Sequence, residues 1–213
     1  MARRLLLFIL VMGLPVLACR APNIGDFLLP GTILFRDDFS DEDIGWLLTD
    51  ADQGQAYYSQ GTFRINVIKP DTQVWSNPGF SFTDVQVEVD ALKTAGEDNN
   101  LFGLICRYQA NKQFYAFVVS SDGYYGVLKY QQGNLTLLDT NAMLPVDHIN
   151  QGNRANHLRF DCVADSLLAS VNNHQIAQYQ DSTFTSGDVG LIAGALQAGR
   201  VEIAFDDFFV LKP

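Results

Sequence analysis

The sequence predicts an all-β protein built as a sandwich or a barrel, and three observations support this. Apolar and polar residues alternate with a period of two, and no segment carries the three-to-four-residue repeat of an amphipathic helix. Turn residues also interrupt the chain at short intervals. With 213 residues, 47% of them hydrophobic and 18% charged, the chain can bury a sizeable core and is too apolar to be disordered.

The first 18 residues are typical of a signal peptide. Two arginines precede an apolar run over residues 5–14, which is shorter than the roughly 20 residues of a membrane-spanning helix. The ending Val16-Leu17-Ala18-Cys19 resembles the lipobox of bacterial lipoproteins, whose cysteine receives the lipid and becomes the mature N-terminus. This resemblance implies lipidation at Cys19. The alternative is an ordinary secretory signal cleaved after Ala18.

Residues 20–31 contain two prolines and two glycines and are expected to form a short tether of at most about 40 Å. We therefore predict a signal peptide over 1–18, a lipidated Cys19 with a tether to residue 31, and one β domain over 32–213. The lipid would anchor the protein to a membrane of a bacterial cell envelope, with the domain exported from the cytoplasm.

The net charge of the chain restricts the classes of molecule that it can bind. Without the two signal-peptide arginines, 12 basic residues stand against 24 acidic ones, a net charge of −12. Such a chain repels nucleic acid and anionic membrane surfaces. It is compatible with neutral sugars, cationic ligands or calcium, and equally with an acidic surface that only maintains solubility.

The first group of strands is expected in the middle of the chain. Over residues 85–91, valine and alanine occupy one face and glutamine, glutamate and aspartate the other. Further strands are expected at 101–108, 114–120, 124–130 and 135–138. Asp122-Gly123, between two aromatic-rich runs, predicts a tight hairpin.

A second group of strands follows to the C-terminus. The expected ranges are 157–164, 167–171, 174–179, 189–193 and 201–211, with turns at Asp165-Ser166 and Asn172-Asn173. In all, about a dozen short strands are expected, the number typical of a sandwich or barrel.

Four segments, in order, resemble the concanavalin A-like lectin/glucanase jelly roll in its laminin-G-like bacterial form. They are Phe35–Phe39 with Trp46; residues 103–108 with 114–117 and 122–125; residues 156–158 with 167–173; and residues 187–191 with 205–208. The resemblance covers residues 34–211 and implies a two-sheet antiparallel jelly-roll sandwich. It implies less about function, because the fold hosts lectins, glycosidases, lyases and adhesive modules.

The set of catalytic residues typical of a glycosidase of this fold is incomplete. β-Glucan-cleaving enzymes of this fold carry Glu-x-Asp-x-x-Glu on one strand, which supplies the nucleophile and the acid. Glu88 and Asp90 begin this pattern, but Lys93 stands where the final glutamate belongs. We therefore expect Glu88 and Asp90 to lie on a solvated strand face and the protein not to be an enzyme. No other nucleophile, zinc or phosphate-loop motif is found, and the three histidines (His148, His157 and His174) are expected at the surface.

Cys106 and Cys162 each share a strand face with apolar residues, so both are expected to point into the core. An exported chain meets an oxidising environment, and a disulfide between them is predicted. Two buried thiols are the alternative.

Paired aspartates near the two ends of the domain suggest a structural calcium site. Terminal strands of the resembled fold often pair, and many of its members hold calcium at about this place. The resemblance thus implies that Asp37, Asp38, Asp206 and Asp207 could share such an ion. Alternatively, these carboxylates only bind nearby backbone or water. No other cofactor is expected.

A ligand patch is predicted from the aromatic residues. Trp75 shares a strand face with Gln73, Arg107 is expected to point outward, and Tyr115 and Tyr125 lie on adjacent hairpin strands that could flank it. These four residues favour a glycan-binding lipoprotein, unless the tyrosines merely cover an outer sheet. The alternatives are an adhesive or envelope-assembly protein that binds a protein partner, and a hydrolase acting on glycans.

Overall fold

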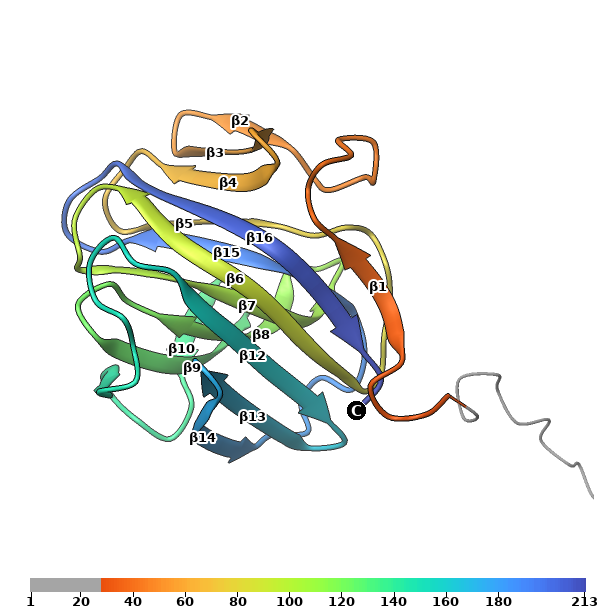
Figure 1. The fold of residues 1–213 in the computed structure, drawn as a ribbon. Coiled ribbons are helices and arrows are strands. Elements are labelled where there is room, and N and C mark those ends of the chain that lie inside the picture. The colour runs from red at the N-terminus through yellow and green to blue at the C-terminus, as the bar shows by residue number, and fades with distance from the viewer. Residues whose placement is uncertain (1–27) are drawn as a thin grey trace, which may run out of the picture.

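The computed structural model describes residues 28–213, which form two antiparallel β-sheets packed face to face (Figure 1). The signal peptide, Cys19 and residues 20–27 of the predicted tether lie outside the described residues. No helix in the part from Leu28 onward has the length and apolarity needed to cross a membrane.

The first sheet has nine strands. Their spatial order is β14 (His174–Gln180), β13 (Ser166–Val171), β12 (Asn156–Val163), β6 (Val85–Ala95), β16 (Val201–Leu211), β4 (Thr62–Val67), β3 (Gly54–Ser59) and β2 (Thr49–Ala51), and β1 (Ile33–Asp37) pairs with β16. The first strand therefore pairs with the last, as expected for the terminal strands.

The second sheet has seven strands. Their order is β10 (Asn134–Leu137), β9 (Tyr124–Gln131), β8 (Gln113–Val119), β7 (Asn100–Gln109), β15 (Asp188–Ala195) and β5 (Thr72–Ser76), and β11 (Leu144–Pro145) pairs with β9. All the strands expected from the alternation of residues 85–211 are confirmed, whereas β2, β3 and β4 were not singled out in the sequence.

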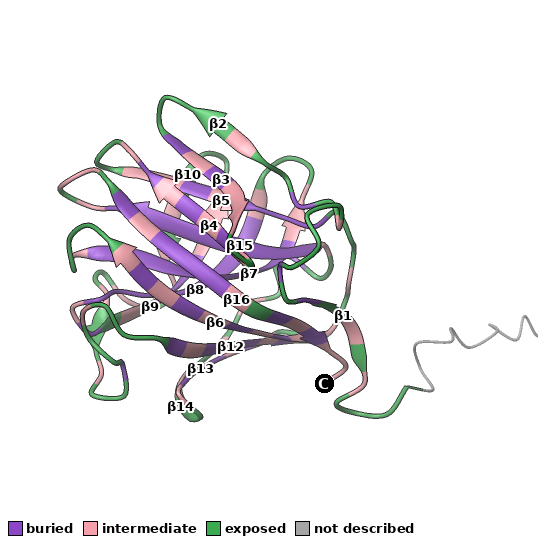
Figure 2. Ribbon diagram, turned by 45° about the horizontal axis from the view of Figure 1, so that its top comes forward, coloured by how far each residue is buried: buried purple, intermediate pink, exposed green. Residues whose placement is uncertain are grey.

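The main core fills the space between the sheets (Figure 2). Alternation explains it, because Val85, Val87 and Val89 of β6 are fully buried while the residues between them are partly exposed. Cys106 of β7 and Cys162 of β12 form a disulfide across this core, with their Cα atoms 6.7 Å apart. The predicted disulfide is confirmed, and it links one sheet to the other.

A second apolar cluster covers the outer face of the seven-stranded sheet. Its buried members are Leu101, Ile105, Phe114, Ala116, Val118, Leu128 and Ile192. Strands β7 and β8 are consequently buried on both faces and read as continuous apolar runs rather than alternating ones. Partly exposed side chains, including Trp75, Tyr108 and Tyr130, cover this cluster.

The seven-stranded sheet is concave on this outer face. Three strands separate β5 from β9, so in a flat sheet their backbones would lie roughly 19 Å apart. Yet the rings of Trp75 on β5 and Tyr130 on β9 have centroids only 5.7 Å apart. The sheet must curl to bring them together, which gathers side chains from distant strands into one place.

Candidate functional site

Three partly exposed aromatic residues meet on the concave face around Phe114, which is fully buried. The ring centroids of Trp75, Tyr108 and Tyr130 lie 5.5, 5.8 and 5.1 Å from that of Phe114. We call Trp75, Tyr108 and Tyr130 the aromatic platform. Because its members come from different strands and pack on one buried ring, the platform presents its exposed surfaces in a fixed arrangement.

A groove of about 260 Å³ runs along the platform between β5 and the β2–β3 hairpin. Trp75 and Tyr108 form its aromatic wall, and Leu47 contributes an exposed apolar side chain. Its polar groups are side chains of several kinds: Thr49, Gln53, Gln73 and Lys112. The groove therefore combines flat apolar surfaces with amide, hydroxyl and ammonium groups, which is the composition of a site for a polar ring-shaped ligand.

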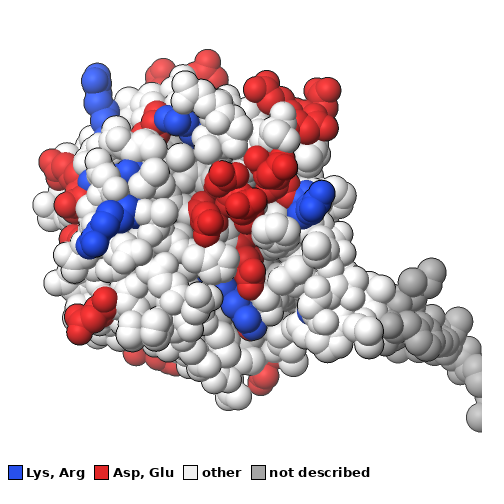
Figure 3. Space-filling model, in the orientation of Figure 1, with Lys and Arg blue, Asp and Glu red and all other residues white. Residues whose placement is uncertain are grey.

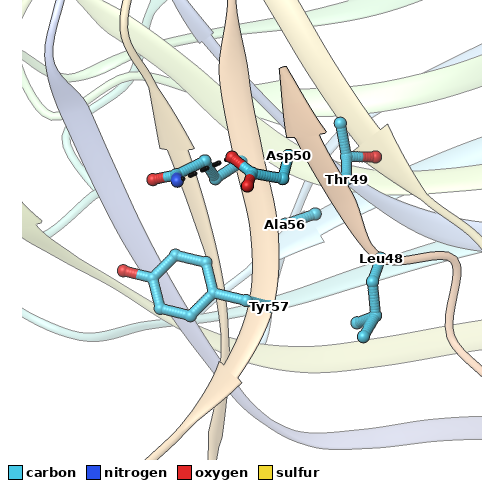
Figure 4. Close-up of a pocket in the computed structure, with 6 residues that line it drawn as sticks. Leu48, Thr49, Asp50, Ala56 and Tyr57 are labelled. Carbon is cyan, nitrogen blue, oxygen red and sulfur yellow. Dashed lines mark hydrogen bonds between the residues drawn. The ribbon is translucent and has the colours of Figure 1, made fainter. Parts of the chain in front are cut away.

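The β2–β3 hairpin separates this groove from a second hollow of about 490 Å³ on its other side. Figure 4 shows Leu48, Asp50 and Tyr57 at that hollow, where Gln55 Nε2 donates to Asp50 Oδ1 at 3.0 Å. Tyr57, the one aromatic residue lining it, donates its hydroxyl to Glu202 Oε2 at 3.0 Å. The first groove is therefore the stronger candidate site, because it has two aromatic residues.

The predicted ligand patch does not form as one surface. Trp75 is partly exposed and lines the groove beside Gln73, as its strand position suggested. Arg107 was expected to point outward, and this was wrong, because its side chain is only 1% exposed. A bulge between Cys106 and Gln109 interrupts the alternation, and Arg107 adopts a left-handed backbone with φ of 55°. The bulge turns Arg107 into the core and leaves Tyr108 on the outer face.

Tyr115 and Tyr125 are also displaced from the predicted patch. Tyr115 pairs with Cys106 and shares its inward face, so its side chain is fully buried. Tyr125 pairs with Val119, four residues further along β8, and packs against the main core. Of the four residues predicted to form the ligand patch, Trp75 alone lines the groove. The other three lie elsewhere in the domain.

Arg107 and Tyr115 instead fix the segment that leads into β15. Arg107 Nη1 donates to the carbonyl of Phe184 at 2.7 Å, and the Tyr115 hydroxyl accepts the Phe184 N–H at 3.0 Å. The same hydroxyl donates to Asp181 Oδ1 at 2.6 Å, and Lys129 Nζ lies 2.5 Å from Asp181 Oδ2. Burial raises the pKa of Tyr115 to about 12, so it remains a neutral donor at ordinary pH.

Asp181 gives this network a predicted pH dependence. Burial raises the pKa of Asp181, but hydrogen bonds from Lys129, Thr183 and Tyr115 outweigh it and hold the pKa well below the usual range. A carboxyl with a lowered folded-state pKa stabilises the fold above its unfolded pKa, near 4, and loses this effect as the pH falls further. Asp181→Asn is therefore expected to lower the unfolding free energy at pH 7 by about 1–3 kcal/mol.

Urea unfolding from pH 7 to pH 2 measures this effect. The difference between the wild type and Asp181→Asn is expected to shrink as the pH falls below about 4. Asp71→Asn, at an exposed turn, serves as the control and should differ little from the wild type at any pH. A difference for Asp181→Asn that stays constant down to pH 2 would contradict the role given to its charge.

The four predicted calcium ligands do not assemble into a metal site. Asp37 is 3% exposed, and both its oxygens accept hydrogen bonds, from the Phe39 N–H at 2.7 Å and from Trp46 Nε1 at 2.8 Å. Asp38 accepts from Ser40, and Asp206 Oδ1 accepts from the Asp207 N–H. Within residues 28–213 no three or more acidic, histidine or cysteine side chains are arranged to hold a metal ion. Asp37, Asp38 and Asp206 instead accept hydrogen bonds from nearby backbone N–H groups, as in the alternative. Asp37 and Asp38 also accept from the side chains of Trp46 and Ser40.

Glu88 and Asp90 lie on the outer face of the nine-stranded sheet, away from the groove. Asp90 Oδ1 is 2.7 Å from His157 Nδ1, and Glu88 accepts from Gln86 at 2.6 Å. Lys93 turns inward, where its ammonium group binds the Gly96 carbonyl and Asp98. Acidic side chains gather on this face, as Figure 3 shows. Burial and the negative charges of Asp207, Asp90 and Asp38 raise the pKa of Asp206.

Tyr108, Tyr130, Gln53 and Lys112 line the platform or the groove but were not predicted as site residues. The sequence contains one pattern that could have identified Tyr130. On β9, Leu128 and Tyr130 alternate with residues that face the core, which places both on the outer face. For Tyr108 the sequence pattern points to the wrong face, because uninterrupted alternation would place its side chain on the inward face with Cys106.

Comparison with known proteins agrees on the fold. No family model and no curated protein matches the chain. Among solved structures, the carbohydrate binding module CBM66 from Bacillus subtilis matches with a TM-score of 0.63 and 17% identity, covering 79% of this chain and 96% of that one. The β-glucanase of Bacillus licheniformis matches at 0.61 and 11%, covering 84% and 98%. A Bacillus subtilis protein of unknown function with a galectin-like fold matches at 0.61 and 14%, covering 86% and 97%.

These identities are too low to assign an activity, and the matched proteins include both a binding module and an enzyme. The similarity is one of overall fold, and it agrees with the two packed antiparallel sheets described above. The chain therefore has the antiparallel two-sheet sandwich of the concanavalin A-like lectin and glucanase fold.

Proposed function

We propose that this chain is an exported lipoprotein, anchored through Cys19, whose domain binds a glycan along the aromatic platform without cleaving it. The observation that carries the proposal is the platform itself, with Trp75 and Tyr108 partly exposed along a groove that Gln53 and Gln73 also line. Pyranose rings have apolar C–H faces that pack on aromatic rings, and their hydroxyls bond to amides. The similarity in fold to a carbohydrate binding module supports the same ligand class.

Binding without hydrolysis is favoured by the groove's chemistry. A glycosidase of the usual kind needs two carboxyl groups beside the scissile bond. The side chains that line this groove, all of them among the described residues, include no aspartate or glutamate. Glu88 and Asp90, which begin the glucanase pattern, lie on the other sheet, and the third position is an inward-facing lysine.

Thermal unfolding of the chain from Arg20 onward, in the presence of an oligosaccharide panel, tests the proposal. The panel includes neutral glucans and uronic-acid oligosaccharides, because Lys112 offers a cation at the groove. A glycan at 100 times its Kd stabilises the native state by about 2.7 kcal/mol, or roughly 5–10 °C for a domain of this size. At least one glycan class is expected to raise the unfolding temperature. No shift with any member would contradict glycan binding and favour a protein ligand.

A further inference from the structure

Exposed apolar side chains are concentrated at the end of the domain where the described chain begins. Leu28, Leu29, Ile33 and Phe80 are 36%, 76%, 50% and 45% exposed, and they are half of the large hydrophobic residues exposed in residues 28–213. We call these four the apolar collar. Single exposed leucines are ordinary on protein surfaces, but a group at one end suggests an interaction surface.

Hydrogen bonds hold the collar in place. A turn in which the Leu29 carbonyl accepts from Thr32 leads directly into β1. The Gly31 N–H donates to the Lys212 carbonyl at 2.7 Å, and the Lys212 N–H donates to the Thr32 carbonyl at 2.9 Å. The start of the domain is therefore fastened to its C-terminal strand, and the exposed leucines project from an ordered segment.

Phe80 is held equally firmly on the neighbouring loop. Asp188 accepts the backbone N–H groups of Gly79 at 2.8 Å and Phe80 at 3.0 Å. The Phe80 ring packs on Phe35 of β1 with centroids 4.8 Å apart, which joins this loop to the first strand. An aromatic ring that is nearly half exposed is thus fixed beside β1, instead of folding onto the core.

The position of the collar indicates what covers it. In Figure 1 β1 begins beside the C-terminus, so the collar lies at the end of the domain where the described chain starts. Eight residues (20–27) lie between Cys19 and Leu28, and the nine Cα–Cα steps from one to the other span at most roughly 32 Å. A lipid on Cys19 would therefore keep this end of the domain close to the bilayer. Lys212, which is hydrogen-bonded through its backbone to Gly31 and Thr32, places a cation beside the collar that suits lipid headgroups.

We propose that the apolar collar docks on the membrane surface and inserts Leu29, Ile33 and Phe80 into the interface between headgroups and acyl chains. This inference rests on the proposed anchor at Cys19. A lipid on a tether fixes residence at the membrane but not the orientation of the domain, and a second, apolar contact of this kind fixes the orientation as well. Docking would hold the domain in one orientation on the bilayer rather than leave it swinging on its tether.

The full chain, processed in a bacterial host and reconstituted in phosphatidylcholine vesicles, tests this docking. Because Cys106 and Cys162 are bonded to each other, a cysteine introduced as Ser81→Cys would be the one free thiol once Cys19 is lipidated. A polarity-sensitive dye at position 81 is expected to emit at shorter wavelength on vesicles and to be quenched by spin-labelled acyl chains. The same dye at Thr136→Cys, on the opposite edge of the seven-stranded sheet, should show neither effect.

Variants separate the collar from the anchor. Leu29→Ser with Ile33→Ser should abolish the emission shift at position 81 while the protein still floats with the vesicles. Leu48→Ser with Leu144→Ser, which also removes two exposed leucines, should leave the shift intact. If the protein floats with the vesicles but the dye at position 81 remains as solvated as the dye at position 136, docking of the collar is overturned. The proposed lipid anchor would be unaffected by that result. Failure of the unsubstituted chain to float would overturn both, and a shift seen only in native membranes would assign the collar to a protein partner.

Discussion

Replacing Cys106 and Cys162 together by alanine is expected to lower the free energy of unfolding by roughly 4 kcal/mol. The disulfide closes a loop with a sequence separation of 56 residues, and in the chain-entropy model its loss restores that freedom to the unfolded state. Because it joins β7 to β12 across the core, it also restricts separation of the two sheets. This is the largest stability effect expected from any covalent feature of the described residues.

Urea unfolding with and without reductant measures this effect. The wild type is expected to unfold at lower urea in reductant, close to the midpoint of the double variant, while the double variant itself should not respond. Replacing both cysteines avoids leaving one buried thiol as an added variable. Equal midpoints for the oxidised and reduced wild type would contradict the stabilising role of the bond.

Trp75→Ala is expected to weaken glycan binding by about 2 kcal/mol, a loss of roughly 30-fold in affinity. Trp75 supplies the largest aromatic surface of the groove, and it packs against both Phe114 and Tyr130, so its exposed face is preorganised. Removing it takes away a stacking surface that needs no rearrangement on binding. Titration calorimetry with the glycan that gives the largest thermal shift measures the change.

Two further variants make this prediction specific. Trp75→Phe keeps a flat ring and should retain more of the affinity than Trp75→Ala. Tyr124→Ala removes an exposed aromatic residue from the same strand as Tyr130, about six residues or roughly 20 Å away. It should bind as the wild type does. Equal losses for Tyr124→Ala and Trp75→Ala would place the ligand elsewhere on the sheet.

The sequence predicts the strands and the disulfide well because both depend on local alternation. One face of residues 85–91 is apolar, and β6 buries that face. Cys106 and Cys162 each sit among apolar residues on their own strands, so each could be placed in the core without knowing the partner strand. Their pairing then needs only that the two strands cross the same core.

The predicted ligand patch failed at Arg107 because a bulge breaks the alternation, and at Tyr115 and Tyr125 because both side chains face the main core. The bulge at Arg107 reverses the faces of Arg107 and Tyr108, and no turn residue in the sequence marks it. The calcium prediction failed for a different reason. The terminal strands pair as expected, but both Asp37 oxygens already accept hydrogen bonds, from the Phe39 N–H and the Trp46 indole, and the described residues form no metal-holding group.

The aromatic platform could not be assembled from the sequence at all. Trp75, Tyr108 and Tyr130 lie on β5, β7 and β9, no two of which are neighbours in the sheet, and the curvature of the sheet brings their rings together. Curvature results from the packing of many side chains and leaves no short motif. The groove also needs the β2–β3 hairpin as its second wall, and those strands were not singled out in the sequence.

The central claim, that a glycan binds on the platform, is tested most directly by the indole N–H signals in nitrogen–proton NMR spectra. The chain has two tryptophans. Trp75 lines the groove, whereas Trp46 is buried and its indole N–H is bonded to Asp37. On titration with the stabilising glycan, the Trp75 indole signal is expected to move in a saturable way while the Trp46 signal stays fixed as an internal reference. A glycan that stabilises the protein but leaves the Trp75 signal unmoved would contradict the account.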